Sequence, residues 1–446
     1  MNVNIKSLKM RFYGAKDIDN LAQLSRLSEQ ERLAMKAVAQ VLPFRTNNYI
    51  VEQLIDWDNI PDDPIFRLTF PHQEMLDSQD CNPMIQLLTE NAPKAVLKEA
   101  ANEIRRRLNP HPAGQKEYNV PTLNGQPVPG IQHKYRETVL IFPTAGQTCH
   151  AYCTFCFRWP QFVGLDDLKF ATRESGIFQQ YLQQHQEVSD VLLTGGDPMT
   201  MKAWQLALYI EPLLEPEFDH IQTIRIGTKS ISYWPYRYVT DEDADNTLRL
   251  FEKIVQRGKH LAIMAHYEHW KELDTPVAQA AIRRIRATGA QIRTQAPLVR
   301  HINDSAETWA KMWQMQVSLG CIPYYMFVER QTGAKDYFEI PLVRGWEIYR
   351  EAIQQVSGLA RTVRGPVMSA LPGKVAIDGV SEIGGEKVFV LSFLQGRESD
   401  WCKRPFFARF DADATWLNDL KPAFEEDKFF YENQLEEILT RKSLKD

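Results

Sequence analysis

The first hundred residues alternate apolar and polar positions at the spacing of amphipathic helices. Residues 28–42 begin with Ser28 as a helix N-cap and continue with apolar residues at helical intervals. Residues 91–108 repeat this pattern, and the next segment, NPHPAGQ, contains two prolines and a glycine that end a helix. The pattern therefore predicts a helical region over residues 1–108.

Residues 109–136 interrupt the helical pattern with many prolines and glycines. Because both residue types favour turns, we expect a connecting arm here. The rhythm of apolar positions changes again near residue 137.

From residue 137 onwards, short runs rich in apolar and β-branched residues recur at intervals of roughly 30 to 50 residues. Helix-length segments lie between the runs, and the spacing is that of a βα unit. Six such units predict an α/β fold with a partial parallel (βα)6 barrel over residues 137–365. The runs are VLIFPT (139–144), DVLLTG (190–195), TIRIGT (223–228), HLAIMAH (260–266), QIRTQAPL (291–298) and YYMFVE (324–329).

Residues 366–446 follow the barrel with mixed patterns. Residues 387–393 read as a strand, an aromatic-rich stretch follows, and the chain ends in a charged segment with helical spacing. We predict a C-terminal α+β extension.

Composition and charge exclude several classes of function. The net charge is −5, which argues against a general nucleic-acid or membrane-surface binder. No apolar stretch approaches the roughly 20 residues of a membrane span. The first residues lack the apolar segment of a secretory signal. We therefore expect a cytoplasmic protein without nucleic-acid or membrane partners, whose cysteines serve metal binding or catalysis.

The residues with distinctive chemistry follow the predicted strands. In a parallel βα barrel the active site lies at the C-terminal ends of the strands. The order of these residues along the chain therefore predicts one shared pocket. They are a cysteine segment after the first strand, Gly195-Gly196-Asp197 after the second, and then Thr228, His266, Gln295 and Glu329.

Three of the six cysteines, Cys149, Cys153 and Cys156, have the spacing C-x3-C-x2-C. Structural zinc takes four ligands, and His150 adjoins Cys149 and would have to reach round its neighbour. A four-iron cluster held by three thiolates leaves one iron open to a small molecule. With Phe155 before the last cysteine, the pattern is the signature of radical S-adenosylmethionine enzymes. We predict a [4Fe-4S] cluster, with structural zinc as the alternative.

The segment VLLTGGDP (191–198) predicts a contact with S-adenosylmethionine. Gly195 and Gly196 allow the backbone to approach a ligand closely, and Asp197 can accept a hydrogen bond from an ammonium group. Thr228 and His266 are further candidate contacts. The alternative is that His266 and His269 are hydrogen-bonded residues of the pocket wall.

Over about residues 25–400 the chain resembles the lysine 2,3-aminomutase family of radical S-adenosylmethionine enzymes. Members of that family are partial barrels that carry a four-iron cluster, S-adenosylmethionine and pyridoxal phosphate (PLP), and they move an α-amino group to the β-carbon. The resemblance implies these cofactors here, with an electron donor such as flavodoxin or ferredoxin. The matching stretches include CHAYCTFCFRW, VLLTGGDP, IRIGTK, AHYEHW, TQAPLVRHIND, PYYMFVERQTG and LPGK.

The resemblance also implies roles for individual residues. Arg158 would clamp the substrate carboxylate, a task that suits a bidentate guanidinium. Gln295 would contact the PLP phosphate, and Lys134 replaces an arginine of the same phosphate site. Thr138 falls where a second phosphate-binding arginine is usual. Lys374, in the short loop LPGK, would be the lysine that holds PLP through its amine.

Substrate choice differs from the lysine enzymes, which grip the distal ammonium with two aspartates. The first maps to Glu329, and the second falls near Ser369, which is not acidic. The substrate is therefore expected to be lysine or a related amino acid. Cys402 stands alone, so assembly through a C-terminal zinc is not expected, and a homo-oligomer stays open.

These inferences predict an isomerase, a PLP-dependent 2,3-aminomutase. Two alternatives stay open. The first is a radical S-adenosylmethionine enzyme without PLP that acts on an amino acid or peptide. The second is a non-catalytic module that binds a metal or a cluster. Cleavage of S-adenosylmethionine and a Lys374-dependent absorption band would distinguish the three.

Overall fold

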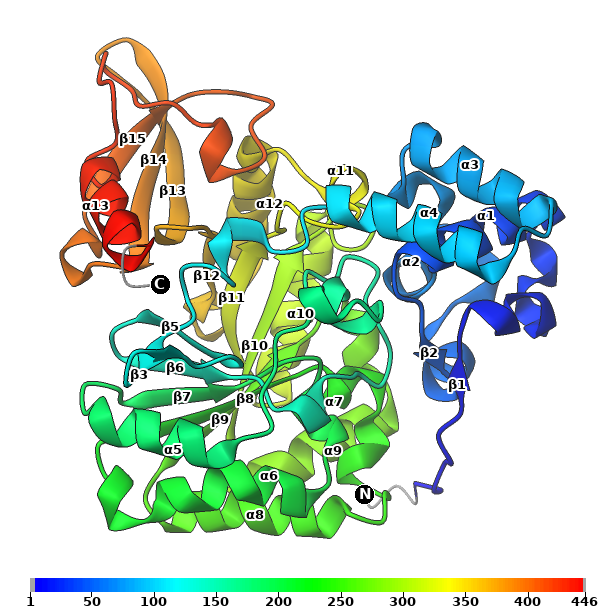
Figure 1. The fold of residues 1–446 in the computed structure, drawn as a ribbon, viewed down its shortest axis with the longest axis horizontal. Coiled ribbons are helices and arrows are strands. Elements are labelled where there is room, and N and C mark those ends of the chain that lie inside the picture. The colour runs from blue at the N-terminus through cyan, green and yellow to red at the C-terminus, as the bar shows by residue number, and fades with distance from the viewer. Residues whose placement is uncertain (1–4, 444–446) are drawn as a thin grey trace.

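The computed structural model describes residues 5–443 (Figure 1). The ends of the predicted N-terminal region and C-terminal extension, residues 1–4 and 444–446, lie outside the described residues. The predicted N-terminal helices are present, and a short strand pair, Phe12–Tyr13 with Thr46–Asn47, joins them. The first long helix begins as predicted, because the Ser28 hydroxyl accepts from the Glu31 amide at 3.2 Å and the Glu31 carboxylate accepts from the Ser28 amide at 2.7 Å.

Within residues 5–443, a single sheet of eleven strands forms the centre of the molecule, in the order β15-β14-β13-β12-β11-β10-β9-β8-β7-β6-β5. Strands β6 to β12 run parallel, whereas β5 and β13 to β15 pair antiparallel at the two edges. The class is therefore α/β with a large, mostly parallel sheet.

The strands have the following bounds: β1 Phe12–Tyr13, β2 Thr46–Asn47, β3 Thr122–Leu123, β4 Gln126–Pro127, β5 Ile131–Tyr135, β6 Thr138–Ile141, β7 Asp190–Leu193, β8 Thr223–Thr228, β9 His260–His266, β10 Gln291–Leu298, β11 Ile322–Val328, β12 Arg364–Ser369, β13 Gly373–Ile383, β14 Glu386–Gly396 and β15 Pro405–Arg409. The helices are α1 Glu29–Val41, α2 Pro64–Thr69, α3 Ser78–Thr89, α4 Lys94–Arg107, α5 Ser175–Gln184, α6 Ala203–Ile210, α7 Ser230–Tyr233, α8 Ala244–Gln256, α9 Pro276–Ala287, α10 Ala306–Ser318, α11 Lys335–Phe338, α12 Leu342–Gln354 and α13 Glu432–Ser443.

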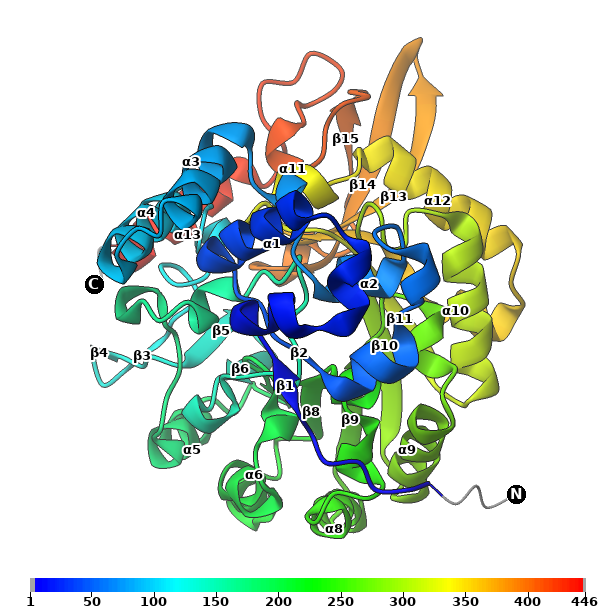
Figure 2. The same ribbon diagram turned by 90° about the vertical axis from the view of Figure 1, so that its right-hand side faces the viewer.

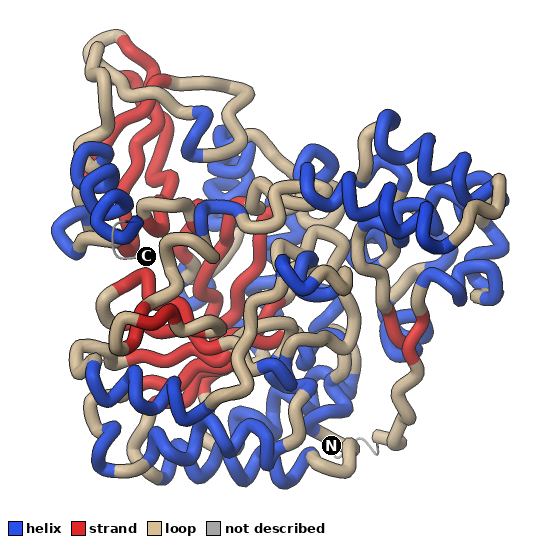
Figure 3. Tube along the Cα trace, in the orientation of Figure 1, coloured by secondary structure: helices blue, strands red, loops and turns tan. Residues whose placement is uncertain are grey.

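The longer helices that connect the parallel strands lie in an arc outside the sheet. Figure 2 shows α5, α6, α8, α9, α10 and α12 along this arc, with the strands inside it. The tube view separates three parts: the helical N-terminal region, the strand-and-helix centre, and the β13–β15 extension with α13 (Figure 3). Each part has a hydrophobic core of its own.

Several strands were not predicted from the sequence, among them β12 and β5 of the central sheet. The parallel part of the sheet holds seven strands in the described chain rather than six, because β12 pairs parallel with β11. Its sequence, RGPVMS, contains Gly365 and Pro366 and lacks a continuous apolar run, so the strand pattern is weak. Likewise β5, IQHKY, is polar at its three central positions and lies in the predicted connecting arm.

The core of the N-terminal region continues into the face of the sheet where the parallel strands end. Trp234, Val299 and Phe338, which follow β8, β10 and β11, belong to the same buried cluster as the N-terminal helices. This packing places the helical region over the C-terminal strand ends, where chemistry is expected. No helix among residues 5–443 combines the length and the apolar character that crossing a membrane requires.

Candidate active site

A cavity of about 330 Å³ lies at the C-terminal ends of the parallel strands. Every site residue predicted from the sequence lines this cavity, although the residues come from segments far apart in the chain. The prediction that they share one pocket is confirmed, while their individual roles stay predictions. The residues are Lys134, Cys149, Cys153, Cys156, Arg158, Gly195, Gly196, Asp197, Thr228, His266, Gln295, Glu329 and Lys374.

The cysteine segment is an extended loop that the N-terminal region holds in place. The Tyr152 amide donates to the Arg45 carbonyl at 2.8 Å, and the Thr154 amide donates to the Leu68 carbonyl at 3.0 Å. The buried Asn47 side-chain amide donates to the His150 carbonyl at 2.9 Å. Because a loop offers few internal hydrogen bonds, these contacts fix its path. Sequence reasoning missed them, since a polar run such as RTNN gives no sign of being buried.

The three cysteine thiols fit the cluster predicted from their spacing. Burial raises the pKa of Cys149 and Cys153 well above the usual range and that of Cys156 to about 11. Buried thiols ionise when a metal supplies positive charge, so these sulfurs are suited to iron ligation. Among residues 5–443, no group of three or more His, Cys, Asp or Glu side chains is arranged so that it could hold a single metal ion. His150, which would have to be the fourth ligand of a structural zinc, does not line the cavity.

Gly196 and Asp197, just after β7, contact the start of the cysteine loop at Thr148. The Asp197 amide donates to the Thr148 carbonyl at 2.7 Å. The Asp197 carboxylate, only 2% exposed, accepts from the Thr228 hydroxyl at 2.7 Å and from the Lys229 amide at 3.0 Å. Burial raises the pKa of Asp197 to about 6. Asp197 therefore joins the ends of β7 and β8, and its predicted contact with an ammonium group stays a prediction.

We expect Gly196→Ala to prevent uptake of a cluster. A Cβ atom at this position would lie 2.5 Å from the Thr148 carbonyl oxygen and 2.6 Å from its nitrogen, so the cysteine loop would have to move. Overpacking of this kind costs about 1–3 kcal/mol. The measurement is iron bound per chain after anaerobic reconstitution. Gly176→Ala is the matched control, because a Cβ at Gly176, in α5, meets nothing within 4 Å. Full iron uptake by Gly196→Ala would contradict this account.

A buried polar network continues from β8 to β10. The Lys229 ammonium lies between the Glu268 and Glu272 carboxylates and donates to both. Burial and the nearby Lys229 charge lower the pKa of His266 to about 3, so its ring is neutral. The His266 Nε2 atom consequently accepts from the Gln295 side-chain amide at 2.7 Å. The structure thus places His266 in a hydrogen-bonded wall of the cavity.

Lys374 lies at the start of β13, whereas the cysteine loop follows β6. These two strands lie toward opposite ends of the strand order, and both segments line the cavity. The Lys374 amine donates to the Gln395 side-chain oxygen at 2.7 Å and lies 4.9 Å from the centroid of the Tyr325 ring. Burial, together with the guanidinium groups of Arg225 and Arg364, lowers the pKa of Lys374 to about 7. A large fraction of the amine is therefore neutral near pH 7, the form that attacks a carbonyl group.

Further cations lie near Lys374 or near the neighbouring Lys134, and the structure pairs them with neutral oxygens. The Lys134 amine donates to the Ala370 carbonyl. The Arg330 guanidinium donates to the Ser369 hydroxyl at 3.1 Å, and Arg397 donates to the Asn119 side-chain oxygen at 2.7 Å. Burial and the positive charges of Arg397, Arg330 and Lys374 hold the pKa of Lys134 well below its usual range. Lys134 and Arg330 line the cavity, and such a group of half-buried cations fits a multiply charged anion such as phosphate.

Four side chains on the cavity wall have buried polar atoms without a hydrogen-bond partner in the described structure. Tyr135 and Glu268 have one such atom each, whereas Arg158, through Nε and Nη2, and Glu329, through both carboxylate oxygens, have two. The Arg158 guanidinium lies 4.2 Å from the centroid of the Phe142 ring. Glu329 is 8% exposed, and burial raises its pKa well above the usual range. Because unpaired buried polar atoms are costly, both side chains are suited to bind a ligand.

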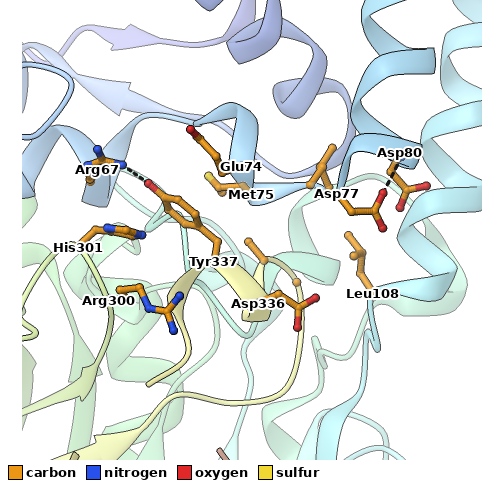
Figure 4. Close-up of a pocket in the computed structure, with 13 residues that line it drawn as sticks. Arg67, Glu74, Met75, Asp77, Asp80, Leu108, Arg300, His301, Asp336 and Tyr337 are labelled. Atoms are coloured by element: carbon orange, nitrogen blue, oxygen red, sulfur yellow. Dashed lines mark hydrogen bonds between the residues drawn. The ribbon is translucent and has the colours of Figure 1, made fainter. Parts of the chain in front are cut away.

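A second opening, of about 480 Å³, lies between the N-terminal region and the segment around α11 (Figure 4). Its wall carries Arg67, Arg300, Tyr337 and several acidic side chains, and none of the predicted site residues. Arg67 donates to the Tyr337 hydroxyl across the opening, as the dashed line in Figure 4 shows. The chemistry of the lining residues, rather than volume, identifies the candidate site.

The fold and the cavity define the class of protein: an α/β protein with a candidate active site at the C-terminal ends of a mostly parallel sheet, lined by three cysteines and a lysine of low pKa. No protein-family model matches the chain. Curated relatives do match, and through them the chain belongs to the lysine 2,3-aminomutase family.

The relatives differ in the amino acid that their names give. The "Putative L-lysine 2,3-aminomutase" of Aquifex aeolicus (strain VF5) is 31% identical over 407 residues, which cover 91% of this chain and 94% of that protein. The L-lysine 2,3-aminomutase of Escherichia coli (strain K12) is 27% identical over 256 residues, 56% of this chain and 69% of that protein. The glutamate 2,3-aminomutase of Clostridioides difficile (strain 630) is 26% identical over 349 residues, 77% of this chain and 69% of that protein.

A structural comparison finds SuiB of Streptococcus suis bound to the precursor peptide SuiA, with 14% sequence identity and a TM-score of 0.35. The match covers 58% of this chain and 52% of that one. At this level the similarity carries no argument about function.

Proposed function

We propose that this chain is a radical S-adenosylmethionine, PLP-dependent 2,3-aminomutase that moves the α-amino group of an amino acid to the β-carbon. The observation that carries the proposal is the meeting of three cysteine thiols and the Lys374 amine on one cavity. Family membership supports the reaction type, and we read the curved sheet inside its arc of helices as the family's partial barrel.

Different residues of the cavity would bind the cluster, the PLP and the substrate. Cys149, Cys153 and Cys156 would hold the cluster, and Lys374 would hold PLP through its neutral amine. Bound together, the cluster and S-adenosylmethionine supply a hydrogen-abstracting radical, and PLP supplies a low-energy path for migration of nitrogen between carbons. Arg158 would bind the substrate carboxylate, because it lines the cavity and its Nε and Nη2 atoms lack a hydrogen-bond partner.

The remaining walls orient the substrate and exclude water. Aromatic side chains line the cavity beside Lys374 and beside the cysteines, among them Tyr135, Tyr325, Phe155 and Phe157. A dry, rigid wall keeps a reactive carbon near its target and away from solvent. The neutral His266 and Gln295 pair offers a fixed donor and acceptor in the middle of the sheet without adding charge.

Glu329 supports an amino acid with a distal donor as the substrate. Its two carboxylate oxygens lack partners in the described structure. By the family resemblance, the second acid of the lysine enzymes falls near Ser369, which is not acidic. Lysine or a related amino acid with a terminal cation would ionise Glu329 and pair with it. An amino acid without a distal donor would leave the carboxyl group unsatisfied.

We propose that Lys134 and Arg330, with Ser369, bind the phosphate of PLP, and that Arg397 adds positive charge beside Lys134. This set makes up for the two arginines that Lys134 and Thr138 replace, since Thr138 is engaged with Asp190 at 3.0 Å. We expect Arg330→Gln to weaken the binding of PLP by about 10- to 100-fold, because a hydrogen bond to a charged group contributes about 1.5–3 kcal/mol. The measurement is the dissociation constant from absorption titration. Pyridoxal without phosphate is the control ligand, and an equal loss for both ligands would exclude a phosphate contact.

Anaerobic reconstitution with iron, sulfide, S-adenosylmethionine, PLP and a reductant tests the proposed function. Lysine, glutamate and arginine are supplied in turn, and β-amino products are sought by mass spectrometry. A β-amino product from one of them is the expected result. Cleavage of S-adenosylmethionine without any β-product would favour the alternative enzyme without PLP. Absence of cleavage would favour the non-catalytic module.

A further inference from the structure

We propose that Tyr233 is a positioning residue that donates a hydrogen bond to the Cys153 thiolate and thereby raises the reduction potential of the cluster. This inference rests on the proposed function, because it needs a cluster at the three cysteines. The family resemblance assigns no role to Tyr233, which lies in α7, more than seventy residues after the cysteine loop.

The contact is direct and enclosed. The Tyr233 hydroxyl oxygen lies 3.1 Å from the Cys153 sulfur, and both residues line the cavity. Tyr233 is 1% exposed. An iron-bound thiolate carries no proton, so the phenol must be the donor in the loaded protein. A hydrogen bond to a charged sulfur in a buried site is stronger than the same contact in water.

The surrounding residues hold the phenol in this position. The buried Asn47 side chain donates to the Tyr233 carbonyl at 2.9 Å and, through the same amide group, to the His150 carbonyl in the cysteine loop at 2.9 Å. One side chain thus fixes the donor and the acceptor segments relative to each other. Asn47 belongs to β2, so the N-terminal region sets this distance.

A buried cation strengthens the donor. The Lys229 ammonium lies 4.4 Å from the centroid of the Tyr233 ring and is held by Glu268 and Glu272. A cation over a ring face draws electron density from the phenol, which makes its O–H group a better donor. Lys229 therefore supports the Tyr233 hydroxyl as a donor to the Cys153 sulfur.

The expected consequence is electrochemical. The reduced cluster carries one more negative charge than the oxidised cluster, so a donor to a ligand sulfur stabilises the reduced form more. Reduction is the step that an external electron donor must drive. Tyr233 would ease that step while leaving the set of iron ligands unchanged.

The experiment compares the midpoint potential of the reconstituted cluster in wild-type protein and Tyr233→Phe by anaerobic redox titration, followed by electron paramagnetic resonance. We expect a more negative potential in Tyr233→Phe, by about tenfold in the reduction equilibrium constant, which is about 59 mV for a one-electron couple. Tyr49→Phe is the matched control. Tyr49 is also fully buried, and its hydroxyl bonds to the Thr275 hydroxyl at 2.7 Å. Its potential should equal that of the wild type.

Each outcome decides between the alternatives. Equal potentials in Tyr233→Phe and wild type would overturn the inference and leave the proposed function standing. A wild-type protein that takes up no cluster would overturn both. Tyr233→Met provides a second variant without a donor, and it should shift the potential in the same direction. Failure of both Tyr233 variants to hold a cluster that Tyr49→Phe retains would also overturn the inference, since Tyr233 would then serve binding rather than potential.

Discussion

Cys153→Ala should abolish both cleavage of S-adenosylmethionine and formation of any β-amino acid. With two thiolates left, the cluster would lose one of its three protein ligands, and the loop offers no substitute because His150 does not line the cavity. The expected loss is at least ~10⁶-fold, the lower end of enzymatic rate enhancements, because the radical is generated only at the cluster. The measurement is 5′-deoxyadenosine formed per chain under reducing, oxygen-free conditions.

Cys402→Ala is the control for this change. Cys402 is exposed and lies outside the cavity, so its removal should leave activity and iron content unchanged. The circular dichroism spectrum and melting temperature of Cys153→Ala should stay close to those of the wild-type protein without cluster. If Cys153→Ala still cleaved S-adenosylmethionine, the three-cysteine site would not be the catalytic centre.

Lys374→Met should eliminate the visible absorption band of bound PLP and reduce turnover strongly. The change removes the amine that would hold the cofactor and move its protons, a role that contributes about 10²–10⁴-fold to rate. Cleavage of S-adenosylmethionine without substrate should persist, because Lys374 is not among the cluster residues. Lys387→Met, on the exposed face of the neighbouring strand β14, is the matched control. An unchanged absorption band in Lys374→Met would assign the cofactor lysine elsewhere.

The same lysine gives a pH dependence. The pKa of Lys374 is lowered to about 7 from an ordinary value of 10.5, first by burial and then by the guanidinium groups of Arg225 and Arg364. Attachment of PLP requires the neutral amine, so the rate of attachment should rise with pH around a midpoint near 7. Between pH 7 and pH 10.5 the unfolded chain binds more protons at this group than the folded chain. The contribution of Lys374 to the free energy of unfolding therefore increases with pH across that window.

Much of the fold was predictable because its signals are local. The Ser28 cap, the six β-branched runs and the cysteine spacing each depend on residues close together in the chain. Strand β12 was missed because Gly365 and Pro366 weaken its local pattern, and its pairing with β11 supplies the order instead. Parallel order also explains why the predicted site residues meet, since strands that point the same way bring their ends to one edge.

The environment of the site was not predictable in the same way. The charge state of Lys374 depends on Arg225 and Arg364, which reach it from other strands. The partnerless oxygens of Glu329 and the contact between Tyr233 and Cys153 are likewise products of packing. No spacing rule relates such pairs, because each depends on how segments from different parts of the chain are placed.

The cysteine loop is held by hydrogen bonds to Arg45, Asn47 and Leu68, and this has a consequence for protein synthesis. These residues leave the ribosome well before Cys149, so the groups that grip the loop are already synthesised when the loop emerges. The loop contributes little structure alone, and it receives its shape from a partner surface made earlier in the same chain. Iron would then be delivered to a cysteine loop whose N-terminal supports were synthesised before its sulfurs.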